Sequence, residues 1–110
     1  MIDHEHLESL TQLIGKDTMD QIRLEFIDDS HEKMTQLLQA WEERNYDALR
    51  DISHSLKSAS LNMALRRFAE QCQQIEMASI QHDGQAIQPI IHQLPALHQA
   101  SLNALADLFT

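Results

Sequence analysis

The chain is poor in the residues that most often interrupt regular backbone, because its 110 residues include only two glycines and two prolines. So few breakers leave little room for hairpins or glycine-rich loops, and long helices are expected. The single cysteine, Cys72, excludes an internal disulfide and a cysteine-based zinc site. No apolar run approaches the roughly 18 residues that a membrane span needs. The first residues lack the basic and apolar segments of a signal peptide, which predicts a cytoplasmic protein.

Basic residues are also scarce, with eight lysines and arginines against 17 acidic residues and a net charge of −9. Nucleic acids and anionic membranes attract basic surfaces, so neither is expected as the main partner. Half of the basic residues nevertheless fall between positions 48 and 69, where Asp51 is the only acid: Arg50, Lys57, Arg66 and Arg67. This segment is either an ordinary solvated surface or a positive island suited to an anion.

Apolar residues recur at spacings of three and four along the whole chain, which predicts amphipathic helices. The 43% hydrophobic and 23% charged residues are typical of a globular protein, and the length fits one domain over residues 1–110. We expect an all-α fold, an antiparallel four-helix bundle (up-down-up-down) with a short additional N-terminal helix. Helices are expected over residues 4–14 and about 17–43, the second with Asp17 as N-cap. Asn45 or Asp47 could cap a third helix, and a fourth would end at Asp83-Gly84. A fifth would have an apolar stripe from Ile87 to Phe109. Pro95 should kink or break the last of these.

His54 lies opposite the apolar stripe of the third predicted helix. At about 100° per residue, the stripe residues cluster within about 80° of arc and His54 projects roughly 180° from their centre. The predicted stripe consists of Leu49, Ile52, Leu56, Ala59 and Met63. No glycine or proline stands between residues 47 and 83, so periodicity alone would also allow one helix of about 36 residues.

Most enzyme classes lack their motifs here. The chain has no glycine-rich phosphate loop, no His-Glu-x-x-His and no Gly-x-Ser-x-Gly elbow. Cys72 lies on an apolar stripe and is read as a small core residue. His4 and His6, with Glu5 and Glu8, could touch a metal, but no second cluster at ligand spacing completes a site. No metal site is therefore expected, and a metal-binding bundle is the weakest of three functional classes.

The surroundings of His54 distinguish it from an ordinary solvated histidine. Lys57 follows at i+3 on the same face, close enough to pair with an anion carried on the imidazole. Leu61 at i+7 offers an exposed apolar side chain for docking. Small neighbours should leave the ring accessible to a large partner: Ser55, Ser58 and Ser60.

His54-x-Leu56-Lys57, followed by Cys72 and then Ile75-Glu76, resembles the histidine-containing phosphotransfer (HPt) domain of bacterial multistep phosphorelays. The core signature of that family reads His-x-Leu-Lys-Gly, a small apolar run, Gly-Ala, and a Cys and Leu-Glu further on. The resemblance covers most of the chain. Ser58 and Ala64 stand where the family usually has glycine, and the resemblance alone puts the break between the third and fourth helices near residues 62–65.

The resemblance implies that His54 accepts a phosphoryl group from the aspartate of one receiver domain and passes it to another. Lys57 and Ser58 would support the phosphate, and Glu76 would hydrogen-bond the imidazole; alternatively, Glu76 is a partly exposed acid whose methylenes cover the core. The protein would need no cofactor of its own, since the receiver brings Mg²⁺. No nucleotide-binding element is present, so a carrier rather than a kinase is expected.

The implied partners are receiver domains of a hybrid sensor histidine kinase and of a response regulator, and we expect a monomer. The docking surface would use the exposed sides of the first and third helices. The candidate contacts are Leu7, Leu10, Ile14, Arg50 and Leu61. The apolar residues of the first helix could equally cap the bundle. The competing class is an interaction-only, HPt-like adaptor that binds receivers without accepting phosphate.

Overall fold

A computed structural model describes residues 2–109, which form five α-helices and no strand. The predicted all-α class is therefore confirmed. The helices are α1 His4–Ile14, α2 Lys16–Glu42, α3 Tyr46–Asn62, α4 Arg66–Ile80 and α5 Gly84–Phe109. Within the described residues, none of these helices has the length and apolar character required to span a bilayer.

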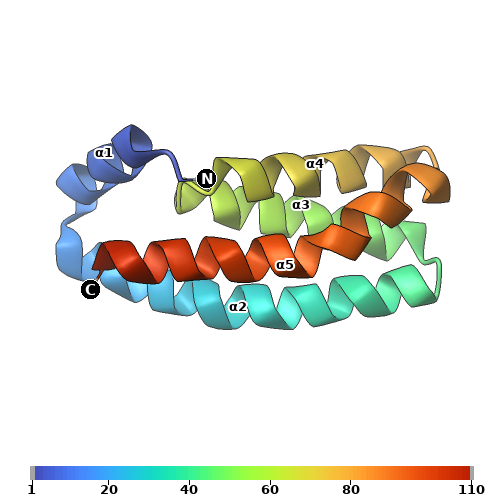
Figure 1. The fold of residues 1–110 in the computed structure, drawn as a ribbon, viewed down its shortest axis with the longest axis horizontal. Helices are drawn as coiled ribbons and strands as arrows, with labels where there is room; N and C mark the ends of the chain where they lie inside the picture. The colour runs from blue at the N-terminus through green and yellow to red at the C-terminus, as the bar shows by residue number, and fades with distance from the viewer. Residues whose placement is uncertain (1, 110) are drawn as a thin grey trace.

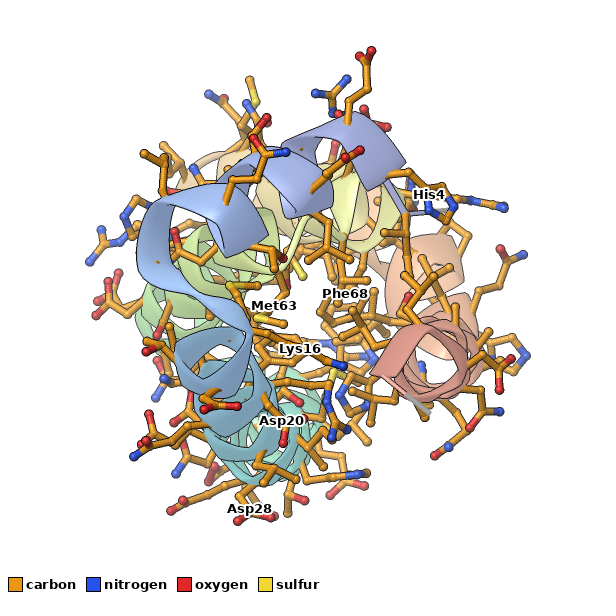
Figure 2. All side chains as sticks on the ribbon, turned by 90° about the vertical axis from the view of Figure 1, so that its left-hand side faces the viewer. His4, Lys16, Asp20, Asp28, Met63 and Phe68 are labelled. Atoms are coloured by element: carbon orange, nitrogen blue, oxygen red, sulfur yellow. The ribbon has the colours of Figure 1, made fainter. Side chains whose placement is uncertain are left out.

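The four longer helices lie side by side along the long axis of the molecule, and the chain reverses direction at each turn (Figure 1). The molecule measures 41 × 21 × 20 Å along its principal axes. Among the helix pairs that are in contact, α3 and α4 share the most extensive contact and α2 and α5 the least extensive. α1 lies across one end, where Met63 and Phe68 point toward the middle of the bundle and Asp28 of α2 points outward (Figure 2). The N-terminal segment is fixed there because the Asp3 amide donates to the Ala64 carbonyl (3.0 Å).

One helix start differs from the prediction. α2 begins at Lys16, so Asp17 lies in its first turn and the predicted Asp17 cap is wrong; Gly15, at φ 88°, occupies the cap position. Glycine adopts this backbone conformation without a steric penalty, which lets α1 end and α2 begin one residue apart. α5 begins at Gly84, where the Asp83 carboxylate accepts from the Ala86 amide (3.1 Å) and caps the helix.

The turn between α3 and α4 falls where the family resemblance predicts it. α3 ends at Asn62 and α4 begins at Arg66, so the single long helix that periodicity allowed is not formed. Ala64 adopts φ 60°, a left-handed conformation that favours glycine. The Leu65 amide donates to the Ser60 carbonyl (2.9 Å) and closes the turn. An alanine thus occupies a glycine-type position, which is why local sequence signals did not reveal the turn.

α5 contains both prolines and remains one helix. Pro95 cannot donate to the preceding turn and its ring crowds that turn, so the backbone must bend there. Figure 1 shows this bend in α5. The predicted kink is present, and the alternative of a broken helix is wrong.

The buried face of α3 is turned toward α4 relative to the predicted stripe. Leu49, Leu56 and Met63 are buried as expected, but Ile52 and Ala59 are only half-buried. Two fully buried serines take part of their place, Ser53 and Ser60. Ser60 therefore does not belong to the accessible surface around His54, contrary to the sequence interpretation.

Ser53 and Ser60 let α3 and α4 approach closely. They lie one turn before and one turn after Lys57, whose ammonium reaches α4, so they share its flank of the helix. Each hydroxyl donates to a carbonyl of its own helix, Leu49 O or Leu56 O, at 2.6 Å. Their burial consequently leaves no donor unsatisfied, and a small side chain separates the two backbones.

α2 and α5 are joined by a buried polar contact. His98 Nε2 of α5 lies 2.8 Å from Ser30 Oγ of α2, and the His98 ring packs edge-on against His31. Burial, with a smaller contribution from His31, lowers the pKa of His98 to about 4. The imidazole is therefore neutral in the folded protein at physiological pH.

Replacing Ser60 by leucine should separate α3 from α4. Extra methylenes in a packed interface cost about 1–3 kcal/mol, so the free energy of unfolding should fall by that amount in urea denaturation. Ser60→Ala is the matched control, because it removes only a hydrogen bond within the helix and should cost less than about 1 kcal/mol. Equal losses in the two variants would contradict close packing at this position.

His98 should make the protein less stable as pH falls from 6.5 to 4. In the unfolded chain His98 has the ordinary histidine pKa of 6.5 and is protonated across most of this range. In the folded protein its pKa of about 4 keeps the buried ring neutral until the pH approaches 4. The free energy of unfolding should therefore drop by about 3 kcal/mol across the range. Urea denaturation at several pH values should show a flatter profile for His98→Gln; parallel profiles would contradict the assignment.

Candidate functional site

His54 and Glu76 meet across the interface of α3 and α4. His54 is exposed, with 58% of its side chain accessible, and its Nδ1 lies 2.8 Å from Glu76 Oε2. The two residues are 22 positions apart in the chain, so the contact depends on the register of the two helices. The imidazole is thereby oriented on one side while it remains open to solvent on the other.

The same carboxylate also binds Lys57. Lys57 Nζ donates to Glu76 Oε1 at 2.8 Å, so each oxygen of Glu76 has one partner from α3. The side chains of Lys57 and Glu76 are only 21% and 17% accessible, which partly shields this ion pair from solvent. His54, Lys57 and Glu76, here called the imidazole triad, form one network.

Glu76 is ionised at neutral pH. Its partial burial raises the pKa, but the hydrogen bonds and positive charges of Lys57 and His54 together outweigh burial and hold the pKa below its ordinary value. An ionised carboxylate only accepts hydrogen bonds, so the neutral imidazole must carry its proton on Nδ1. The other ring nitrogen, Nε2, then has a free lone pair and can act as a nucleophile.

The positive island suggested by the sequence is largely neutralised. Arg50 pairs with Asp47 at 3.9 Å and with Asp51 at 3.1 Å, and Arg66 pairs with Asp3 at 2.6 Å. Arg66 also lies ten residues before Glu76 on α4, about 15 Å away along the helix axis. Of the four basic residues in the segment, Lys57 is the one that belongs to the imidazole triad.

The remaining sequence-predicted site residues fall on different surfaces. Ser58 and Leu61 are exposed on α3 beside His54, whereas Ser55 is half-buried. In α1, Leu7 is buried in the core and Leu10 packs against it, so both cap the bundle; Leu7 does not offer a docking surface. Ile14 is exposed at the end of α1.

Sequence periodicity missed four exposed apolar residues: Leu13 on α1, Met77 and Ile80 on α4, and Leu108 on α5. Met77 and Ile80 lie next to Glu76 in the chain. Both residues lie off the apolar stripe of α4. Their spacing of i+1 and i+4 from Glu76 is the sequence signal that could have indicated exposed apolar residues near this site.

Other chemistry has little support in the described residues. Within residues 2–109, no group of three or more His, Cys, Asp or Glu side chains is arranged to hold a metal ion. Cys72 is buried, and burial raises the pKa of its thiol to about 12, so a reactive thiolate does not form at neutral pH.

Comparisons with known proteins agree with this geometry. A family model described as the Hpt domain matches residues 21–107, from the first turns of α2 to the last turn of α5. The fold is similar to the crystal structure of histidine-containing phosphotransfer protein B (HptB) from Pseudomonas aeruginosa PAO1, with a TM-score of 0.90 at 23% sequence identity. That likeness covers 98% of this chain and 93% of the other. No curated protein matches the sequence. Because the family model spans most of the chain and includes all three residues of the imidazole triad, the chain belongs to the Hpt domain family of histidine phosphotransfer proteins.

Proposed function

We propose that this protein relays a phosphoryl group between the aspartates of two receiver domains through a phosphohistidine at His54. The observation that carries the proposal is the 2.8 Å hydrogen bond between His54 Nδ1 and Glu76 in a chain of the Hpt family. It orients an exposed imidazole and leaves Nε2 as the nucleophile. A solvated surface histidine would have no reason to be held in one tautomer by a half-buried lysine–glutamate pair.

In the first step, the Nε2 lone pair of His54 attacks the phosphorus of a receiver phosphoaspartate. The new P–N bond forms as the acyl P–O bond breaks, and the aspartate leaves as a carboxylate. The proton on Nδ1 stays in place, so the ring becomes a phosphorylated imidazolium whose positive charge faces the Glu76 carboxylate. In the second step, an aspartate carboxylate of another receiver attacks the same phosphorus, and His54 leaves as neutral imidazole.

Lys57 would act at two moments. Before transfer its ammonium holds Glu76 ionised and in place through the 2.8 Å contact with Oε1. After transfer the phosphoryl group adds negative charge near the same helix face, and Lys57 at i+3 is close enough to share its charge with that group. Ser58, exposed one turn after His54, leaves room for the phosphate and can donate a hydrogen bond to it.

The receiver would supply the Mg²⁺ and most of the charge neutralisation that phosphoryl transfer requires. This division of labour fits a carrier without its own kinase activity. The same proposal includes three further expectations. The partners would be receivers of a hybrid sensor kinase and of a response regulator, the location would be cytoplasmic, and the protein would be a monomer. The alternating chain direction in Figure 1 supports classifying α2–α5 as an up-down-up-down four-helix bundle, with α1 as the additional helix.

Label transfer tests the proposal directly. The protein is mixed with a ³²P-labelled phosphoreceiver and Mg²⁺ without ATP, and wild type is compared with His54→Gln. Acid-labile, alkali-stable label should appear on wild type and be absent from the variant, because glutamine lacks the nucleophilic nitrogen. If several receivers bind wild type without transferring label, the protein is an interaction-only adaptor and the relay proposal is wrong.

Replacing Glu76 by glutamine should slow transfer without abolishing it. The amide replaces one carboxylate oxygen by an NH₂ donor, so in the present geometry it can accept from only one of His54 and Lys57. Losing a charge-assisted hydrogen bond to so exposed a ring should lower the transfer rate roughly tenfold. Lys57→Gln is the comparison and should cost less, about two- to fivefold, as expected of a partly exposed ion pair.

Nitrogen-15 NMR of His54 separates positioning from mere stability. In wild type the neutral ring should be predominantly the Nδ1–H tautomer, and in Glu76→Gln this tautomer should lose population. An unchanged tautomer in the variant would contradict the role given to Glu76, even if the transfer rate fell.

A further inference from the structure

Two large apolar side chains on α4 are exposed beside the imidazole triad. Met77 is 60% and Ile80 is 58% accessible, although α4 has an otherwise complete buried stripe against the other helices. Neither residue takes part in the core. Exposed apolar residues are common when single, but these two are neighbours on the helix and adjoin a reactive group.

The helical positions fix which flank they occupy. Around α4, Cys72 lies about 40° from Glu76 on one side and Ile80 about 40° on the other, with Met77 about 100° from Glu76. Cys72 is fully buried, so Ile80 and Met77 lie on the outward side of Glu76. Because Glu76 itself reaches His54 and Lys57, this outward side is the one that adjoins α3. Met77 and Ile80 thus border the surface that carries His54.

The charges of the molecule single out the same surface. α3 and α4 each contain two acidic and two basic residues, so these two helices have no net charge. The net charge of −9 lies entirely in the rest of the chain, and α2 alone carries seven acidic against three basic residues. Along α4 from Gln71 to Ile80, Glu76 is the only charged residue, and Lys57 neutralises it.

We propose that Met77 and Ile80 form an apolar docking contact for the receiver domain, extending the binding surface from α3 onto α4. This inference rests on the proposed phosphotransfer function, and in it Met77 and Ile80 help to determine which receiver the protein binds. The neutral surface of α3 and α4 is where an aspartate-rich phosphorylation pocket can approach without repulsion. Together with exposed Leu61 on α3, the apolar pair supplies the apolar area that the otherwise polar surroundings of His54 lack.

An interface of standard size that is centred on His54 reaches these residues. A specific interface covers about 800 Å² on each partner, a patch roughly 15 Å in radius. If such a patch is centred on His54, it includes Met77, next to Glu76, and Ile80, less than one turn further along α4. A second copy of this chain is a weaker candidate for the same surface, because two molecules of charge −9 repel each other.

The test compares the double variant Met77→Gln/Ile80→Gln with wild type. Glutamine keeps the charge and the helix, and Gln73, Gln74 and Gln81 already occupy exposed neighbouring positions. The matched control is Leu24→Gln/Leu38→Gln, which removes two exposed leucines from acidic α2. Calorimetric Kd for an unphosphorylated cognate receiver should rise about tenfold in the double variant and stay within twofold of wild type in the control.

A second readout isolates the chemistry of His54 from docking. Phosphoramidate, a small donor that needs no protein contact, should phosphorylate His54 at the same rate in wild type and in the double variant. A receiver Kd that is unchanged in the double variant would overturn the proposal. It would also be overturned if the phosphoramidate rate fell in parallel with binding, or if sedimentation showed a wild-type dimer that the variant dissociates.

Failure of the relay itself would be seen separately. Because Kd is measured with unphosphorylated receiver, the docking contact is tested even if no label reaches His54. Wild-type protein that binds the receiver through Met77 and Ile80, yet takes no phosphoryl group, would refute the relay and support the docking surface.

Discussion

The close approach of α3 to α4 is the constraint on which the site depends. The 2.8 Å contacts of Glu76 with His54 and Lys57 join two helices, and they exist only if the helices meet in one register and at short distance. Buried Ser53 and Ser60 permit that distance, since larger side chains would force the backbones apart. The core of the bundle thus determines the tautomer of a residue on its surface.

The ion pair between Lys57 and Glu76 affects the protonation of His54 more than the stability of the fold. An exposed lysine–glutamate pair adds little to stability. Here the lysine and glutamate are mostly shielded, and the stronger consequence is electronic: an ionised Glu76 assigns the proton of His54 to Nδ1. The Glu76 carboxylate, shared by Lys57 and His54, therefore orients the ring and fixes its protonation pattern. In the proposed relay it would also face the positive charge that phosphorylation would create.

Much of this arrangement could be predicted from the sequence, and the exceptions have physical reasons. Periodicity indicated the helices and the outward direction of His54, because apolar spacing reports burial directly. It could not reveal the turn at Ala64, since an alanine took a conformation usually given to glycine. Ser53 and Ser60 were missed because polar residues satisfied by their own helix carry no apolar signal. The contact between His54 and Glu76 came from family resemblance, as register across 22 residues is not a local property.

The uneven charge distribution has a consequence for motion before contact. With neutral α3 and α4 on one side and an acidic α2 on another, the molecule carries a permanent electric dipole in addition to its net charge. In the field of an approaching acidic protein, such a dipole experiences a torque that turns α2 away and presents His54 during rotational diffusion. Added salt would weaken the overall repulsion and the orienting torque together, within a Debye length of about 8 Å at physiological ionic strength. The same acidic residues that keep the protein in solution would thus also reduce the fraction of collisions that meet the wrong side.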